Sequence, residues 1–234
     1  MKNRIHIREL KEQVGNEVTI AGFVDVRRDH GKLVFLDIRD RSGKVQCVVT
    51  PDKKEAHKSA TELRPEWVVS ITGKVNPRPE KMVNKDEPNG AIEIEITGIA
   101  VLGKAKELPF ELGTETHLDT HLDYLPLTLR GKKYQAIFRV QAAVVRAFRE
   151  FFTGEGFVEF QAPKLIGDDA EGGANSFDVS YFKYTAHLSQ SPQLYKQIMV
   201  GVFERVFATP KVFRGEKHAT PRHLSEYSSL DFEM

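Results

Sequence analysis

The sequence has almost no cysteine: Cys47 is the single one among 234 residues. One thiol excludes an intrachain disulfide and a zinc site built from several thiolates, and it suits a reducing compartment. Long apolar runs are also missing, since no stretch approaches the roughly 20 residues of a membrane-spanning helix. The first ten residues, MKNRIHIREL, are charged and lack the apolar core of a secretion signal. These absences predict a cytoplasmic chain without a membrane span.

An excess of charge of either sign is missing too. The chain has 34 Lys and Arg against 33 Asp and Glu, a formal net charge of +1. This balance neither requires nor excludes a nucleic-acid partner, so any basic surface must be local. The apolar fraction of 40% is typical of folded globular proteins. A chain of this length has room for one large domain or two modest ones.

Five stretches in the first hundred residues alternate between apolar and polar side chains, as strands with one buried face do. They are residues 17–28, 32–40, 45–49, 66–75 and 91–101. A polar stretch that begins with proline, residues 51–63, lies between the third and the fourth and predicts a helix. Three strands, a helix and two strands are the order of an OB-fold, a five-stranded Greek-key barrel. The alternation predicts that Val24, Val26, Val34, Leu36 and Ile38 point into it.

The outer face of the predicted barrel carries side chains that suit nucleic acid. Phe35 alternates with inward residues and therefore points outward, and Arg27 and Gln46 of the neighbouring strands fall on the same face. An exposed aromatic ring beside arginine and glutamine can stack an unpaired base and bind its edges. The alternative is that Phe35 packs under a loop or against a second domain. The pattern alone leaves both open.

The last 31 residues, ERVFATPKVFRGEKHATPRHLSEYSSLDFEM, predict two strands joined by a charged loop. The second strand alternates, with Tyr227, Asp231 and Glu233 on one face. Arg214 ends the first strand and Arg222 lies beyond the loop, and the guanidinium fork binds phosphate oxygens bidentately. The sequence therefore predicts a polyphosphate site here. An ordinary solvated surface hairpin is the alternative.

The string F-R-G-E, a short loop, R-H-L-S-E and S-L-D-F-E-M resembles motif 2 of the class II aminoacyl-tRNA synthetases. This resemblance implies that Arg214 is the catalytic residue, bridging the amino-acid carboxylate and the α-phosphate of ATP. It also implies an ATP-binding set with Arg214 at its centre. The set is Arg214, Glu216, Arg222, His223 and Leu224.

The stretch E-G-G-A-N, followed by Q-S-P-Q-L-Y-K-Q, resembles the aspartyl-specific form of that family. The resemblance implies that Lys196 pairs with the side-chain carboxylate of aspartate, while Glu171 and Gln193 hold the amino end and Arg214 the α-carboxylate. An ammonium group that faces a carboxylate accepts a neutral amide poorly, which agrees with this role. An asparaginyl-type enzyme is the alternative, although that form tends to read Q-S-S-Q-L-Y and lacks the lysine.

The barrel strings G-F-V-D-V-R-R, G-K-L-V-F-L-D-I-R-D and G-K-V-Q-C-V resemble the anticodon-binding domain of the aspartyl, asparaginyl and lysyl subgroup. This implies that Phe35 stacks on an anticodon base and that Gln46 and Arg27 help to read the anticodon of tRNA(Asp). Asp25 takes the place where tRNA-selective archaeal relatives carry a large aromatic residue. Charging of tRNA(Asn) as well is therefore an open alternative.

Residues 133–152 predict a long helix with one buried apolar stripe, and residues 157–163 a strand that ends in proline. The pair resembles motif 1 of class II synthetases, which forms their homodimer interface. The stripe consists of Ile137, Val140, Val144, Phe148 and Phe151.

The predicted fold is therefore an α+β multidomain protein: an OB-fold anticodon-binding domain, a linker and the first part of a class II antiparallel-sheet catalytic domain. The corresponding ranges are 1–104, 105–132 and 133–234. The resemblance implies an aspartate–tRNA ligase that uses L-aspartate, ATP and Mg²⁺. Motif 3 and the acidic magnesium ligands of the family are missing, so no metal ligand is expected here and the chain is expected to be a fragment with little or no activity. A non-catalytic tRNA-binding module is the remaining alternative.

Overall fold

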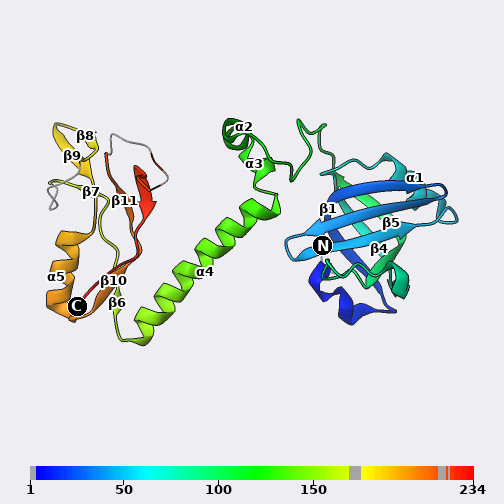
Figure 1. Ribbon diagram of the computed structural model, residues 1–234, viewed down its shortest axis with the longest axis horizontal. Helices are drawn as coiled ribbons and strands as arrows, with labels where there is room; N and C mark the ends of the chain where they lie inside the picture. Colours follow the sequence, from blue (N-terminus) through cyan, green and yellow to red (C-terminus); the bar gives the residue numbers. More distant parts are fainter. Residues whose placement is uncertain (1–3, 169–174, 216–219, 221) are drawn as a thin grey trace. The chain divides into compact units, whose positions relative to one another are not determined.

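The computed structural model describes residues 4–168, 175–215, 220 and 222–234, and Figure 1 shows it coloured along the sequence. The chain divides into two compact units, Met1–Glu111 and Leu112–Met234. None of the helices in the described residues is long and apolar enough to cross a membrane.

The first unit is a closed barrel of five strands in the order β1-β2-β3-β5-β4, which confirms the predicted OB-fold. A helix connects β3 to β4, and two short 3₁₀ helices complete the unit. The elements are η1 Ile7–Gln13, β1 Glu17–His30, β2 Leu33–Asp40, β3 Gly43–Val49, α1 Lys54–Glu62, β4 Val68–Pro77, η2 Glu80–Met82 and β5 Ile92–Gly103.

The inside of the barrel is filled by β-branched and leucine side chains from alternate positions of every strand. Leu36, Ile38 and Cys47 are fully buried, and Ile7 and Leu10 of η1 belong to the same cluster. Burying a side chain of this size contributes about 1.5–3 kcal/mol, so the barrel is held chiefly by this core. Burial also raises the pKa of the Cys47 thiol, which makes it a poor nucleophile at neutral pH.

Strand β1 contains a β-bulge that the alternation of the sequence does not reveal. Val24 lies opposite Ile38, but the next pair joins Val26 to Asp37, so Asp25 is the extra residue. An extra residue reverses the faces of everything beyond it. The expected inward position of Val26 is therefore wrong: its side chain points outward and is 39% exposed.

The second unit combines helices with three small sheets. The sheet orders are β13-β10-β6, β11-β12 and β7-β9-β8. The helices are α2 Leu118–Asp123, α3 Leu125–Thr128, α4 Lys132–Gly154 and α5 Gln193–Phe203. The strands are β6 Val158–Glu159, β7 Leu165–Ile166, β8 Asp178–Tyr181, β9 Tyr184–Leu188, β10 Val206–Ala208, β11 Lys211–Phe213, β12 Glu226–Ser228 and β13 Asp231–Glu233.

The last stretch of the chain forms two short strands where the sequence predicts one. β12 pairs with β11, as expected for the two strands around the charged loop, and β13 pairs with β10 instead. The chain changes partner at Ser229 and Leu230, and the backbone N–H of Ser229 donates to the carbonyl of Pro210 at 2.9 Å. Asp231 and Glu233 therefore lie in the sheet that packs beside α5.

Helix α4 has the expected length, but the prediction that its apolar stripe is buried is wrong. Val140 and Phe151 are 62% and 61% exposed, and Ile137 and Val144 are exposed too. Phe152 in the last turns of α4 stacks on Phe207 with ring centroids 5.7 Å apart, and Tyr134 in the first turn stacks on His121 of α2. Phe148 of the stripe is half-buried and meets Phe207 edge-on, whereas the other four stripe residues are exposed.

Candidate functional site

The outer face of the barrel carries a connected polar network in the middle of strands β1, β2, β3 and β5. Arg28 donates from both terminal nitrogens to the carboxylate of Asp37, at 2.9 and 3.0 Å. Arg28 also donates to Oε1 of Gln46 at 3.3 Å, and Nε2 of Gln46 donates to Glu93 at 3.0 Å. The guanidinium of Arg78 lies 3.8 Å from the same Glu93 carboxylate. Opposite charges alternate along this row and balance one another.

The network fixes the orientation of the Gln46 amide. Its oxygen faces a guanidinium, which can only donate, and its nitrogen faces a carboxylate, which can only accept. A side chain held at both ends presents one defined pattern of donors and acceptors to a ligand. Such a group can distinguish one base edge from another.

Phe35 lies on this same face, half-buried on β2 directly opposite Arg28. The ring of His30 contacts it edge-on, with centroids 5.7 Å apart. A half-buried aromatic ring beside a fixed arginine and glutamine can stack an unpaired base. The face therefore combines a stacking platform with hydrogen-bonding groups.

Arg27 does not lie on this face, so the expectation that it stands beside Phe35 and Gln46 is wrong. The bulge at Asp25 turns Arg27 to the inner side of β1, opposite the buried Leu36. Its guanidinium reaches the end of α1 instead, where it donates to the carbonyl of Thr61 and, at 3.2 Å, to that of Leu63. Arg28, which the alternation assigned to the other face, takes the position expected for Arg27.

In the second unit, Lys196 on α5 points at the carboxylates of β13. Its ammonium nitrogen lies 2.6 Å from Oδ1 of Asp231 and 3.5 Å from Oε2 of Glu233, and the lysine side chain is 11% exposed. Helix α5 packs on the sheet through Tyr195, Met199 and Val200, which directs this lysine inward. The three side chains together carry one negative charge.

The pKa of Lys196 is raised above its ordinary value. Burial of the ammonium acts to lower it, but the hydrogen bond to Asp231 and the charges of Asp231 and Glu233 outweigh burial. The lysine is therefore a permanent cation at neutral pH. A permanent cation at a nearly dry position is suited to bind a carboxylate rather than to transfer a proton.

Arg214 directly follows β11, next to the segment that leads into α5. The backbone N–H of Phe213 donates to the carbonyl of Ser189, and that of Arg214 to the carbonyl of Ser225, both at 3.0 Å. The guanidinium carbon lies 6.0 Å from the centroid of the Tyr227 ring. Sequence reasoning assigned no site role to Tyr227, although its place one strand across from Arg214 could have been inferred from the hairpin.

Gly215 brings the loop before β8 against the end of β11. Its N–H donates to the carbonyl of Asn175 at 2.7 Å, and a Cβ at this glycine would stand 2.7 Å from the same oxygen. Only glycine allows this approach. The end of the glycine-containing stretch E-G-G-A-N and the start of the charged loop therefore meet at this point.

The remaining predicted site residues make fewer contacts with the rest of the site. Gln193 opens α5 one turn before Lys196, with its N–H donating to the Ser191 hydroxyl at 3.1 Å. Arg222, His223 and Leu224 are exposed; His223 contacts the Thr220 hydroxyl at 2.8 Å through Nδ1. Glu171 and Glu216 lie outside the described residues, and their expected roles stay predictions.

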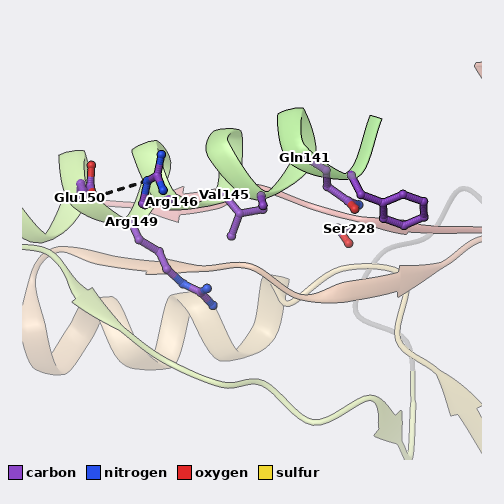
Figure 2. Close-up of a pocket in the computed structure, with 8 residues that line it drawn as sticks. Gln141, Val145, Arg146, Arg149, Glu150 and Ser228 are labelled. Carbon is purple, nitrogen blue, oxygen red and sulfur yellow. Dashed lines mark ion pairs between the residues drawn. The ribbon is translucent and has the colours of Figure 1, made fainter. Parts of the chain in front are cut away.

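Two further features of the structure are relevant to the site: the arrangement of possible metal ligands and a pocket. Among the described residues, no group of three or more His, Cys, Asp or Glu side chains is arranged to hold a metal ion. Figure 2 shows a hollow along α4, to which Arg146, Arg149, Glu150 and Ser228 contribute. The hollow has a volume of about 640 Å³. Its apolar part comes from Phe138, Ala142 and Val145. None of the predicted substrate-binding residues that the structure describes lines this hollow.

Comparison with known families assigns each unit. A family model described as tRNA synthetases class II (D, K and N) matches residues 117–234. A second, described as OB-fold nucleic acid binding domain, matches residues 18–102. Both matches confirm the fold class that the sequence predicts.

Curated relatives align along nearly the whole chain. The aspartate–tRNA(Asp/Asn) ligase of Deinococcus radiodurans is 44% identical over 231 residues, which cover 97% of this chain and 50% of the relative. The ligase of the same name from Thermus thermophilus is 44% identical over 235 residues, 99% of this chain and 52% of the relative. The chain spans about half the length of the curated relatives it matches.

Solved structures give the same result for the fold. The asparaginyl-tRNA synthetase of Pyrococcus horikoshii, complexed with asparaginyl-adenylate, matches with a TM-score of 0.88 and 33% identity, over 99% of this chain and 53% of that one. The aspartyl-tRNA synthetase of Entamoeba histolytica matches with a TM-score of 0.80 and 31% identity, over 99% and 50%.

Proposed function

The chain belongs to the class II tRNA synthetases of the D, K and N group. From this premise we propose that it forms part of an aspartate–tRNA ligase. The reaction has two steps. The carboxylate of L-aspartate attacks the α-phosphorus of ATP, which gives aspartyl-adenylate and releases pyrophosphate. A terminal ribose hydroxyl of the tRNA then attacks the acyl carbon and releases AMP.

The observation that carries the aspartate assignment is the contact between Lys196 and Asp231 at 2.6 Å, beside Glu233. An ammonium group has three donors, so one is left for a third carboxylate, that of the substrate side chain. The two protein carboxylates leave the cluster with a net negative charge, which favours the substrate's α-ammonium close by. Aspartate carries both groups, whereas asparagine would present a neutral amide to the lysine.

Activation of the carboxylate needs positive charge where the α-phosphate gains negative charge. Arg214 stands at the end of β11, one hydrogen bond away from the segment that opens α5. We assign it the bridge between the aspartate carboxylate and the α-phosphate. Arg222, His223 and Leu224, together with Glu216, complete the proposed ATP site. Magnesium enters as part of the ATP substrate, and no step is assigned to a protein-bound metal.

The barrel supplies the tRNA specificity in this proposal. Phe35 stacks an anticodon base, and Gln46, with its amide fixed between Arg28 and Glu93, reads the edge of that base. The side chain of Asp25 is engaged by Arg39 at 3.1 Å and by Lys44 at 3.7 Å. Because the relatives are named for both tRNA(Asp) and tRNA(Asn), we propose that the enzyme charges both.

The assembled enzyme is proposed to be a cytoplasmic homodimer. The support is the stripe of α4, which exposes Ile137, Val140, Val144 and Phe151 to solvent. A contiguous apolar helix face of this kind usually marks an interface. The α4 face would then be buried against its symmetry mate.

The test is ATP–pyrophosphate exchange by a protein of the relatives' length that carries this sequence. Exchange should depend on aspartate and prefer it over asparagine by about 10³-fold or more, as expected where a site pairs a polar group. Lys196→Met should remove this preference, and Arg214→Ala should abolish exchange while tRNA binding is kept. Lys211→Met, which changes an exposed ion pair with Glu226, is the matched control. Comparable exchange with asparagine in the wild type would overturn the aspartate assignment.

The alternatives give different results in the same assay. An asparaginyl-type enzyme would exchange with asparagine. A non-catalytic tRNA-binding module would show no exchange with either amino acid although its barrel binds anticodon stem-loops. The first alternative finds support in the fold of the Pyrococcus horikoshii enzyme, but the buried cation at Lys196 argues against it.

A further inference from the structure

The β1–β2 hairpin continues beyond the bulge as a two-stranded arm, residues 27–30 paired with residues 33–36. Gly31 and Lys32 form its tip, and Gly31 has a φ of +62°, which the turn requires. On its outer face the arm carries Arg28, His30 and Phe35. The arm is therefore continuous with the face that we propose to read the anticodon.

Helix α1 is joined to this arm at two points. Nε2 of His57 lies 3.1 Å from the carbonyl oxygen of Lys32; because a carbonyl can only accept, this nitrogen carries the proton. At the other end of the helix, the guanidinium of Arg27 binds the carbonyls of Thr61 and Leu63. The tip of the arm and α1 therefore form one surface with a fixed arrangement.

The side of α1 that meets the tip is basic. Ala56 and Ala60 are buried against the barrel, whereas Lys54 and Lys58, one turn apart, are exposed. These two lysines are neighbours on the helix surface, and the neighbouring position on the side of the tip is His57. The acidic residues of the helix, Glu55 and Glu62, fall beyond the lysines, on the side away from His57.

Lys54, Lys58 and the exposed Lys32 make no ion pair within the described part of the chain, although acidic residues are close in sequence. Asp29 pairs with Arg27 at 3.1 Å and Asp52 with Lys53 at 3.4 Å. The negative charges of Asp29 and Asp52 are thereby largely neutralised. Lys32 at the tip and Lys54 and Lys58 on α1 are left facing solvent, while the exposed Glu55 and Glu62 lie on the side of α1 away from the tip.

We propose that Lys32, Lys54 and Lys58 form a phosphate-binding track that runs from the base-binding face around the tip of the arm to α1, which Arg27 holds on the inner side of the arm. When a base of an RNA stacks on Phe35, the RNA backbone must continue beyond this face. The three lysines lie where a backbone that follows the arm would pass. Phosphate contacts fix the position of the RNA, while base contacts supply selectivity. This inference rests on the proposed tRNA-binding function and adds a second surface to it.

The experiment is a titration of the whole chain with an anticodon stem-loop at several salt concentrations. The wild type is compared with a double variant, Lys54→Gln with Lys58→Gln. Each lost phosphate contact lowers the slope of log K against log salt by about 0.7–0.9, so the double variant should lose about 1.4–1.8 from the slope. Its preference among anticodon triplets should not change. Lys74→Gln with Lys106→Gln, two exposed lysines elsewhere in the same unit, makes the same change in charge and should leave the slope within about 0.3 of the wild type.

The outcomes separate this inference from the proposed function. If the wild type discriminates among triplets but the α1 variant keeps the full salt slope, or falls no further than the control pair, the track is wrong and the reading face stands. If the wild type binds no stem-loop at all, the proposed function of the barrel fails and the track fails with it. Circular dichroism of each variant verifies that the fold is unchanged.

Discussion

Arg28 lies directly opposite Phe35 across the β1–β2 ladder, and Arg27 lies opposite the buried Leu36. One inserted residue, Asp25, decides which of two adjacent arginines points to the outer face of the barrel. The two arginine side chains therefore have different structural roles. Arg28 fixes the Gln46 amide, whereas Arg27 ties the end of α1 to the barrel.

The first prediction follows for Arg28→Ala. The variant loses the bidentate contact with Asp37 and leaves the Gln46 amide held only by Glu93, so it should bind an anticodon stem-loop about 1–3 kcal/mol more weakly. Discrimination among triplets should decrease with affinity. Fluorescence titration with labelled stem-loops measures both.

Arg27→Ala is the matched comparison, one residue away and with the same change in charge. We expect it to lose about 1–2 kcal/mol of unfolding free energy, because two carbonyls at the end of α1 lose a charged donor. Its triplet preference should persist. Urea unfolding and the same titration decide: a loss of triplet preference in Arg27→Ala with full preference in Arg28→Ala would contradict the assignment.

A second prediction concerns the lysine–carboxylate cluster. Lys196→Met leaves Asp231 and Glu233 facing each other without a cation, whereas Asp231→Asn leaves the lysine with Glu233 at 3.5 Å. The free energy of unfolding of Lys196→Met should be about 1.5–3 kcal/mol lower than that of the wild type. Asp231→Asn should be more stable than Lys196→Met. Urea unfolding at pH 7 tests this order. Equal stabilities for both variants would show that the cluster is not coupled.

The same cluster has a matched control and a pH test. Lys211→Met removes an exposed pair with Glu226 and should change stability by no more than about 0.5 kcal/mol. Because the two carboxylates raise the folded pKa of Lys196, the cost of Lys196→Met should be full below the unfolded lysine pKa of about 10.4 and should shrink as the pH rises through the folded value. A cost that is independent of pH would assign the loss to packing alone.

A third prediction concerns Asp40, which joins the N-terminal segment to the β2–β3 turn. Its carboxylate accepts from Ser42 N and Oγ at 2.7 and 2.6 Å and from the Ile7 N–H at 3.2 Å. Burial acts to raise the pKa of Asp40, but these hydrogen bonds, those of Ser42 foremost, outweigh it and lower the pKa. The stabilisation is therefore present above the unfolded pKa of about 3.9 and is lost as the pH falls through the folded value.

Asp40→Asn should consequently cost about 1–3 kcal/mol at pH 7, and the difference from the wild type should shrink below pH 4. Urea unfolding of both proteins between pH 7 and pH 3 measures it. Asp86→Asn, at an exposed aspartate of the same unit, is the control and should show little difference at any pH. A difference for Asp40→Asn that stays constant down to pH 3 would exclude the charge as its cause.

The barrel was largely readable from the sequence because period-two alternation reports which face each strand buries. Val34, Leu36 and Ile38 are buried as predicted. The position of Arg27 could not be read, because a bulge inserts one residue without a change in composition. Asp25 carries no signal of its own that would distinguish it from an ordinary outward residue.

The second unit shows the opposite limit. The periodicity of α4 predicts an apolar stripe, and the stripe exists, but periodicity cannot say what covers it; Val140 and Phe151 face solvent in the described chain. The partners of Lys196 could not be predicted either. Asp231 and Glu233 lie some thirty-five residues further along the chain, on a strand that leaves β11 to pair with β10.

The most direct test of the account is the triplet preference of the chain itself. Stem-loops carrying GUC, GUU and an unrelated triplet are titrated at one stated salt concentration, since affinity for RNA depends on salt. The account predicts similar affinities for GUC and GUU, each about 1–3 kcal/mol tighter than the unrelated triplet. Equal affinity for all three would contradict the anticodon-reading barrel, and binding of GUC alone would contradict the proposed charging of both tRNAs.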